Sequence, residues 1–310
     1  MAPAGDAANF DVIVVGASLT GIIAAQRLLQ AHPETRLGIL ERDYCVGGVW
    51  SKRRIYPSFW TQCTHGIAEF SDMPMERPPA EDCMHDLFRA EYTTRYLEDY
   101  VDKMGHAGRT LRDRIRFNTE VQSIKNVLDG QWQLVCVDTT SGSQHLVSSS
   151  RLMMANGQSS VPNVPNLPGR ENFRGQIIHS IDFGQSDVVK DKSIQHVAVI
   201  GAGESAADIV YEAAKAGKTV SWIIRKTGNG SLGVAAFAPI DLPTPYSSAP
   251  LHAADGRSSS SSSYYELTLP SIMWQNGTAG GCHFADVWPL VAEKVYVHRA
   301  GVKLLSEREL

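Results

Sequence analysis

A strand–turn–helix–strand pattern that occurs twice constrains the fold of this 310-residue chain more than any other feature. In each copy a short apolar run ends at a glycine, a helical stretch follows, and a second apolar run ends at a charged residue. Such apolar runs are typical of strands buried in a parallel sheet. We therefore predict an α/β fold. The predicted strand–helix–strand segments are residues 10–15, 20–31 and 37–40 in the first copy, and residues 196–200, 204–216 and 219–224 in the second.

The second copy has a GxGxxA turn between its first strand and its helix, over residues 201–206 (GAGESA). Gly201 suits a tight turn, Gly203 lets the backbone approach a pyrophosphate, and Ala206 lets the helix pack closely on the strand. The helix N-terminus, which includes Ser205, offers unpaired N–H groups to the phosphates. The turn predicts a Rossmann-like dinucleotide site. The alternative is a parallel-sheet turn without a ligand, because glycine-rich turns are common.

The first copy has the related turn GASLTG over residues 16–21. Gly16 and Gly21 keep the outer glycines of the pattern, but Ser18 replaces the middle one. A serine side chain crowds the pyrophosphate, although its hydroxyl has a proton to donate to it. We expect dinucleotide binding at this turn to be weakened rather than abolished.

The residues that close the second strand of each copy differ in charge. Glu41 lies 25 residues after Gly16, and Arg225 lies 24 residues after Gly201. A carboxylate in this position accepts hydrogen bonds from the ribose diol of NAD or FAD. A guanidinium attracts the 2′-phosphate of NADPH, which a carboxylate repels. The first site is therefore predicted to take an unphosphorylated ribose and the second NADPH. The alternatives are a solvated strand end at Glu41 and a surface cation at Arg225.

The remaining segments give weaker patterns. Val121 ends one predicted strand and is assigned to the predicted cofactor-binding set. Residues after 231 give no overall fold, and they include a serine run that has no apolar surface to bury. We predict loops over residues 42–75, helices over 86–103 and 290–302, and strands over 115–121, 131–137 and 151–155.

Composition argues against several function classes. Apolar residues make up 43% of the chain and charged residues 20%, which is enough for a sizeable core. A net charge of −4 indicates no nucleic-acid or membrane-surface partner. None of the five cysteines forms a CxxC pair, so neither a zinc site nor a dithiol redox motif is indicated. Because the N-terminus is short and polar and no apolar run is long enough to span a membrane, we predict a soluble, cytoplasmic protein.

A third motif lies between the two copies. Phe173, Gly175, His179 and Phe183 have the spacing of FxGxxxHxxx(Y/F). This segment resembles the identifying motif of the flavin-containing monooxygenases, also called dimethylaniline monooxygenases, and the chain is most similar to their fungal members. Baeyer–Villiger relatives carry Trp at the last position, where this chain has Phe183. For His179 taken alone, the alternative is a linker histidine whose hydrogen bonds are satisfied.

Other segments support the resemblance. Residues 47–50 (GGVW) are similar to the GGxW segment that lies along the flavin, which assigns Gly48 and Trp50 to the cofactor site. Residues 154–157 (MANG) resemble the hinge that leads into the NADPH domain, and residues 70–74 (FSDMP) resemble the FSDxP stretch of the family.

The resemblance implies two Rossmann-like domains, with the NADPH domain inserted into the FAD domain. We expect the FAD-binding domain over residues 1–164, the NADPH-binding domain over 165–232, and a divergent tail over 233–310. In the family, a later segment completes the FAD domain. No such segment is recognised after residue 230, so we expect this C-terminal return to be missing.

A further departure concerns the predicted catalytic position. Counting from Tyr56, the position at which the family usually carries Asn is Gln62. The resemblance implies that this amide helps to hold the geometry of substrate oxygenation near the flavin, which makes Gln62 the catalytic candidate. The alternative is that this loop is aligned one residue off.

The resemblance implies an FAD- and NADPH-dependent monooxygenase. NADPH reduces FAD, the reduced flavin forms a C4a-hydroperoxide with molecular oxygen, and a nitrogen or sulfur centre of a small-molecule substrate takes up one oxygen atom. Two alternatives stay open. One is a shortened, weakly flavin-binding or non-catalytic protein, and the other is a flavoprotein that catalyses a dehydrogenation or a non-redox step. The substrate and the oligomeric state do not follow from the sequence.

Overall fold

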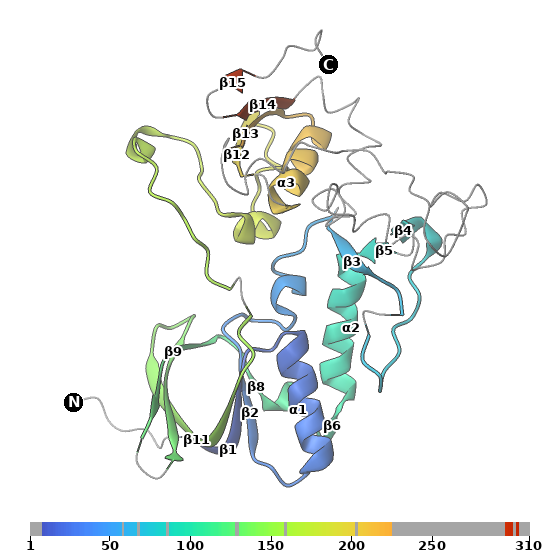
Figure 1. Ribbon diagram of the computed structural model, residues 1–310, viewed down its shortest axis with the longest axis vertical. Helices are drawn as coiled ribbons and strands as arrows, with labels where there is room; N and C mark the ends of the chain where they lie inside the picture. Colours follow the sequence, from blue (N-terminus) through green and yellow to red (C-terminus); the bar gives the residue numbers. More distant parts are fainter. Residues whose placement is uncertain are drawn as a thin grey trace. The chain divides into compact units, whose positions relative to one another are not determined.

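The computed structural model describes residues 8–57, 59–66, 69–84, 87–127, 130–157, 160–201, 204–224, 295–299 and 302–303. The chain divides into two compact units. The first comprises Met1–Ile55 and Thr93–Leu167, and the second comprises Tyr56–Tyr92 and Pro168–Leu310. Each unit contains one strand–turn–helix–strand copy (Figure 1). The chain passes from one unit to the other at 55/56, 92/93 and 167/168. The expected domain boundaries at 164/165 and 232/233 stay predictions.

A six-stranded sheet forms the centre of the first unit, in the order β8–β2–β1–β11–β10–β9. β1 pairs in parallel with both β2 and β11, and β2 pairs in parallel with β8. β9, β10 and β11 pair antiparallel. The turn after β1 therefore leaves the sheet between two parallel neighbours, the usual place for a ligand crevice in an α/β sheet. The strands are β1 (Ala8–Val15), β2 (Leu37–Leu40), β8 (Ile115–Arg116), β9 (Thr119–Asn126), β10 (Trp132–Asp138) and β11 (Gln144–Met154).

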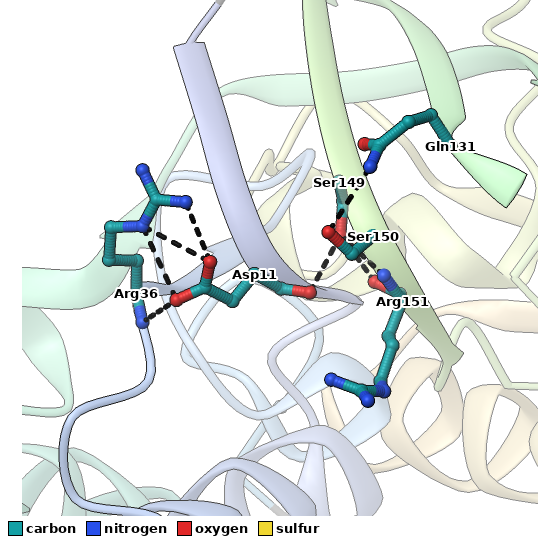
Figure 2. Close-up of polar contacts among 6 residues, drawn as sticks. All are labelled: Asp11, Arg36, Gln131, Ser149, Ser150 and Arg151. Carbon is teal, nitrogen blue, oxygen red and sulfur yellow. Dashed lines mark hydrogen bonds and ion pairs between the residues drawn. The ribbon is translucent and has the colours of Figure 1, made fainter. Parts of the chain in front are cut away.

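Polar contacts join β1 to both of its neighbours near its beginning (Figure 2). Arg36, just before β2, donates to Asp11 with an Nη2–Oδ1 distance of 2.6 Å. On the other side, the hydroxyl of the buried Ser149 lies 3.5 Å from the Asp11 carbonyl oxygen. Hydrogen bonds from Arg36 keep the pKa of Asp11 below its ordinary value. Because the Asp11–Arg36 pair is exposed, it contributes little stability and mainly helps to fix the strand register.

Helix α1 (Leu19–Ala31) packs against β1 and β2. Its buried residues recur at helical spacing and form one core-facing side, which comprises Gly21, Ile22, Ala25, Gln26 and Leu29. A second buried cluster comprises Ile13, Val15, Leu40, Leu134, Cys136 and Val147. Burying an aliphatic side chain of this size contributes about 1.5–3 kcal/mol. The core therefore anchors the ends of β1 and β2, after which Gly16 and Glu41 follow.

The second unit contains a sheet in the order β12–β13–β14–β15. β12 (His196–Ile200), β13 (Thr219–Ile224) and β14 (Val295–Arg299) pair in parallel, and β15 (Val302–Lys303) pairs antiparallel with β14. Helix α3 (Glu204–Lys215) connects β12 to β13. The core of this unit is formed by Val199, Ala206, Ala207, Val210, Tyr211, Ala213, Ala214, Val220 and Trp222.

Shorter elements complete the two units. In the second unit, β3 (Trp60–Thr64), β5 (Leu87–Arg89) and β4 (Cys83–Met84) form an antiparallel sheet. β5 continues directly into helix α2 (Ala90–Lys103), whose residues from Thr93 onward belong to the first unit. The other short elements are η1 (Gly48–Trp50), η2 (Ala80–Asp82), β6 (Gly105–His106), β7 (Arg109–Thr110), η3 (Arg112–Arg114), η5 (Arg170–Asn172) and η6 (Ser180–Gln185).

The elements of the two copies agree with the sequence prediction, and β2, β12 and β13 have the predicted bounds. Several other predictions were wrong. The helix predicted from residue 86 begins at Ala90, because Leu87–Arg89 pair with β3. The strand predicted over 115–121 is divided into β8 and β9 by a turn in which Asn118 has a φ of 53°.

Two regions contain strands that local patterns did not show. The predicted loop over residues 42–75 contains β3, and the predicted helix over 290–302 contains β14. The strand predicted over 151–155 is only the end of the longer β11. In each case the strand is stabilised by pairing with a partner distant in sequence, which a local pattern does not encode.

Candidate dinucleotide-binding sites

Gly16 forms the turn between β1 and α1 in a conformation that favours glycine. Its φ is 103°, and a Cβ added to it would lie 2.5 Å from the carbonyl oxygen of Ala155. A Cβ on Gly21 would lie 1.9 Å from the carbonyl oxygen of Gly16. Close backbone packing therefore requires both outer glycines. Within the described residues, the N-cap Ser18 makes no side-chain hydrogen bond to the first turn of α1, so the N–H groups of that turn stay available to an anion.

The Ser18 side chain connects this turn to the second glycine-rich turn of the unit. Its hydroxyl donates to the carbonyl oxygen of Gly47 at 3.1 Å, and the Gly47 N–H donates to the carbonyl oxygen of Ala17 at 2.9 Å. A Cβ on Gly48 would lie 2.7 Å from Ser18 Oγ. The Ser18 hydroxyl thus has a partner inside the protein, and its effect on dinucleotide binding stays a prediction.

Glu41 follows β2, and its carboxylate lies beside the first turn. Oε2 accepts a hydrogen bond from the Ala17 N–H at 2.7 Å, and Oε1 accepts one from the Asp43 N–H at 2.9 Å. The residue is only 8% exposed, and burial raises the pKa of its carboxyl group. A carboxylate has about four acceptor positions. Glu41 is therefore buried rather than solvated and keeps acceptor capacity for ribose hydroxyls.

The second turn begins at Gly201, which has a φ of 133°. The indole N–H of the buried Trp222 donates to the Gly201 carbonyl oxygen at 2.6 Å. A Cβ on Gly201 would lie 3.7 Å from the Cβ of Ala206, which is itself buried in α3, whereas Ser205 is exposed. The structure therefore shows the glycine-type conformation of Gly201 and the close helix–strand packing. Gly203 and Arg225 lie outside the described residues, and their roles stay predictions.

A sequence model of the flavin-binding monooxygenase-like family matches residues 9–235. The match includes both turns and the motif over residues 173–183. The chain belongs to the flavin-binding monooxygenase-like family. This confirms the resemblance inferred from the sequence.

Fungal relatives are similar to the same part of the chain. The FAD-dependent monooxygenase rstn6 of Aspergillus nomiae is 37% identical over 240 residues, which cover 71% of this chain and 38% of that protein. An FAD-dependent monooxygenase of Pyrenophora dematioidea is 39% identical over 232 residues, covering 71% and 40%. The chain thus spans about two fifths of the length of these curated relatives. A solved structure of oxidised steroid monooxygenase bound to NADP is 26% identical, with a TM-score of 0.56 over 70% of this chain and 39% of that chain.

The family motif ends in the short helix η6 (Ser180–Gln185) of the second unit. His179 is the N-cap of this helix, and its Nδ1 accepts a hydrogen bond from the Ile181 N–H at 3.2 Å. Phe183 is 4% exposed and contacts Tyr56 edge to face, with ring centroids 5.2 Å apart. His179 thus helps to shape its own segment, and Phe183 packs that segment into the second unit.

Tyr56 connects the motif to helix α3. Its hydroxyl donates to Asp208 Oδ2 at 2.6 Å, and its ring stacks on Phe59 at a centroid distance of 5.0 Å. Asp208 is 8% exposed. The sequence analysis used Tyr56 only as a reference for counting and missed this pair, whose members are 152 residues apart. The sequence feature that could have indicated this contact is the carboxylate of Asp208 in the helix after the second turn.

The other predicted site residues lie in three different elements. Gln62 lies in β3 of the second unit, and Trp50 ends η1. Val121 lies in β9, where its partly buried side chain packs against the core cluster. The structure brings Gly16, Ser18, Glu41 and Gly48 together, as the contacts above show. For Gln62, Trp50 and Val121, contact with a cofactor or substrate stays a prediction.

Neither a membrane-spanning helix nor a metal cluster is present in the described part of the chain. None of its helices is both long and apolar enough to cross a bilayer. Its His, Cys, Asp and Glu side chains form no group of three or more that is suited to hold a metal ion.

Proposed function

We propose that this chain forms the dinucleotide-binding part of an FAD- and NADPH-dependent monooxygenase that oxygenates a nitrogen or sulfur centre of a small molecule. The arrangement at the first turn carries the proposal: Gly16, the N-terminus of α1 and the Glu41 carboxylate lie together. These groups complement a pyrophosphate and an unphosphorylated ribose diol. Relatives that are FAD-dependent by name support FAD as this dinucleotide.

The second unit is proposed to bind NADPH. The Trp222 indole N–H holds Gly201 just after β12, and α3 begins at Glu204, so the helix N-terminus suits a second pyrophosphate. A similar steroid monooxygenase has been solved bound to NADP, which supports this choice. Arg225 closes β13 in sequence, where a guanidinium attracts a 2′-phosphate.

The residues of the chain bind and orient the cofactors. Reduced FAD supplies the oxygen-activating chemistry when it is bound. Glu41 accepts hydrogen bonds from the ribose, and the N–H groups at the start of α1 bind the diphosphate. The Ser18–Gly47 hydrogen bond keeps the GGxW turn beside that helix terminus. The Gln62 amide is proposed to form hydrogen bonds near the reacting centre.

A weakly flavin-binding protein, or a flavoprotein that catalyses a dehydrogenation or a non-redox step, is the second candidate. Ser18 favours weak binding, because its side chain occupies the position at which the fingerprint has glycine.

The deciding experiment uses the full chain. Flavin content is measured after purification and after addition of FAD, and NADPH consumption, peroxide and oxygenated product are then measured together with a simple amine or thioether. We expect the chain to bind added FAD, to oxidise NADPH faster than NADH, and to form an oxygenated product. A chain that binds no added FAD contradicts the proposal. A flavin-loaded chain that forms no product supports the second candidate.

A further inference from the structure

Arg54 is a buried cation whose charge is only partly balanced by neighbouring groups of the first unit. Its side chain is 10% exposed, and its Nε is buried without a hydrogen-bond partner. Within the described residues, its guanidinium has one ion pair, with 3.8 Å between Nη2 and Asp43 Oδ2. A guanidinium carries five N–H donors, and burying a charge is costly unless it is paired and hydrogen-bonded.

The neighbouring carboxylates are already engaged. Arg53 donates to the other oxygen of Asp43, whose side chain is 3% exposed. Both oxygens of Glu41 accept backbone N–H groups. The segment from Glu41 to Asp43 and the pair Arg53–Arg54 together contain three arginines and two carboxylates, so positive charge is in excess. One of these arginines, Arg54, is nine-tenths buried, and solvent screens a buried charge poorly.

Backbone contacts place Arg54 next to the first dinucleotide turn. The Arg54 N–H donates to the carbonyl oxygen of Ser51 at 2.8 Å, and the Ser51 N–H donates to that of Gly48 at 3.2 Å. Gly48 contacts Ser18, the N-cap residue of α1. Arg54 therefore follows the glycine-rich turn at Gly47 and Gly48, which contacts the proposed diphosphate site through Ser18. Its partner Asp43 is also two residues beyond Glu41, the proposed ribose acceptor.

We propose that the guanidinium of Arg54 binds the negatively charged diphosphate of FAD. The inference rests on the proposed function and extends it to a side chain outside the glycine fingerprint. The excess positive charge is arranged before the ligand arrives, so the diphosphate supplies the counter-charge that the protein itself lacks. Burial lowers the pKa of Arg54, but an arginine stays protonated at neutral pH.

This role predicts opposite effects on the empty and the loaded protein. A buried charge that is poorly paired is costly, and Asp43 keeps Arg53 as its partner when Arg54 is replaced. Arg54→Met should therefore leave the melting temperature of the FAD-free chain unchanged or raised. It should also weaken FAD binding by about tenfold or more, because a hydrogen bond to a charged group is lost. A structural ion pair would behave differently, since its removal lowers the stability of the empty chain.

The experiment measures FAD affinity by flavin fluorescence and the melting temperature of the FAD-free chain, with ADP and adenosine as competitors. Arg54→Met is compared with Arg54→Lys, which keeps the charge, and with Arg27→Met, which removes an exposed arginine of α1. We expect Arg54→Met to lose affinity for FAD and ADP but not for adenosine, Arg54→Lys to lose less, and Arg27→Met to resemble the wild type.

Three results would overturn the inference: FAD affinity unchanged in Arg54→Met, equal losses for ADP and adenosine, or a lower melting temperature of FAD-free Arg54→Met. A wild-type chain that binds neither FAD nor ADP would instead contradict the proposed function, and the inference that rests on it would fail as well. The two failures are therefore distinguishable from the wild-type titration.

Discussion

At the scale of single residues, Ser18 shows how a departure from a motif acquires a structural role. Its hydroxyl donates to Gly47, and its Oγ occupies the space beside Gly48. The hydroxyl and the Cβ therefore have separable effects. The hydroxyl joins two turns, whereas the Cβ adds bulk next to the proposed diphosphate site.

Two variants separate these effects. Ser18→Ala removes the hydroxyl and should lower the free energy of unfolding by about 0.5–1.5 kcal/mol, the net value of one hydrogen bond, with little change in FAD affinity. Ser18→Gly also removes the Cβ and should bind FAD more tightly than Ser18→Ala. Urea unfolding and FAD titration measure the two quantities. Weaker FAD binding by both variants would show that the hydroxyl contacts the cofactor.

Glu41 should make stability and FAD affinity respond to pH in opposite directions. Burial raises the pKa of Glu41 above its ordinary value of 4.5, so the folded chain holds this proton more tightly than the unfolded chain. Its contribution to stability is present below pH 4.5 and is lost as the pH rises through the raised pKa. Ribose hydroxyls donate to the ionised carboxylate, so FAD affinity should increase over the same interval. In Glu41→Gln both dependences should flatten, and an unchanged pH profile of FAD affinity would rule out this role for Glu41.

Arg225 is proposed to determine the choice between NADPH and NADH. Arg225→Ala should weaken NADPH binding by roughly 1.5–3 kcal/mol, the range for a hydrogen bond to a charged group. NADH binding should barely change, because NADH has no 2′-phosphate. Calorimetric titration with both nucleotides tests this, and an equal loss for both would contradict the assignment.

At the scale of elements, α3 also contacts a segment distant in sequence, the loop before β3. A strand and its loop, expected as structureless chain between the two copies, belong to the same unit as this helix. The Tyr56–Asp208 hydrogen bond joins the loop before β3 to α3. Strand β3, which follows this loop, contains Gln62, the proposed catalytic residue.

Tyr56→Phe keeps the aromatic ring but removes the hydroxyl. It should lower the free energy of unfolding by about 1–3 kcal/mol, because the buried Asp208 carboxylate loses a donor. Asp208→Asn keeps an acceptor oxygen without the charge and serves as the matched variant. Urea unfolding of both single variants and the double variant gives the coupling energy. Strictly additive effects would show that the two side chains do not stabilise each other.

At the scale of the whole molecule, we propose that each of the two compact units has its own dinucleotide site and that the two sites act independently. Gly16→Ala introduces a Cβ 2.5 Å from a backbone oxygen, and Gly201→Ala places alanine at a φ of 133°. Each variant should sharply reduce binding of its own dinucleotide and change the affinity for the other by no more than about twofold, because effects at independent sites add. Titrations with FAD and NADP⁺ measure this. Loss of both affinities in either variant would show that the sites are coupled.

The sequence by itself determined the features that depend on local spacing. The apolar runs before Gly16 and Gly201 specified the parallel strands, and the glycine spacing specified the turns where backbone meets backbone. The position of the acidic residue Glu41 and the motif ending at Phe183 could also be identified from the sequence, because each is defined by spacing along the chain. These local signals were sufficient to indicate the family.

Only the tertiary structure decided which distant residues meet. Strands β3 and β14 have no clear local pattern, since their stability comes from pairing with partners elsewhere in the chain. The partners of Ser18 and Tyr56 are likewise far away in sequence. The incomplete compensation of Arg54 became visible only through its burial and its distance from Asp43. A sequence lists charges and donors, but the fold decides which of them lose water and which find a partner.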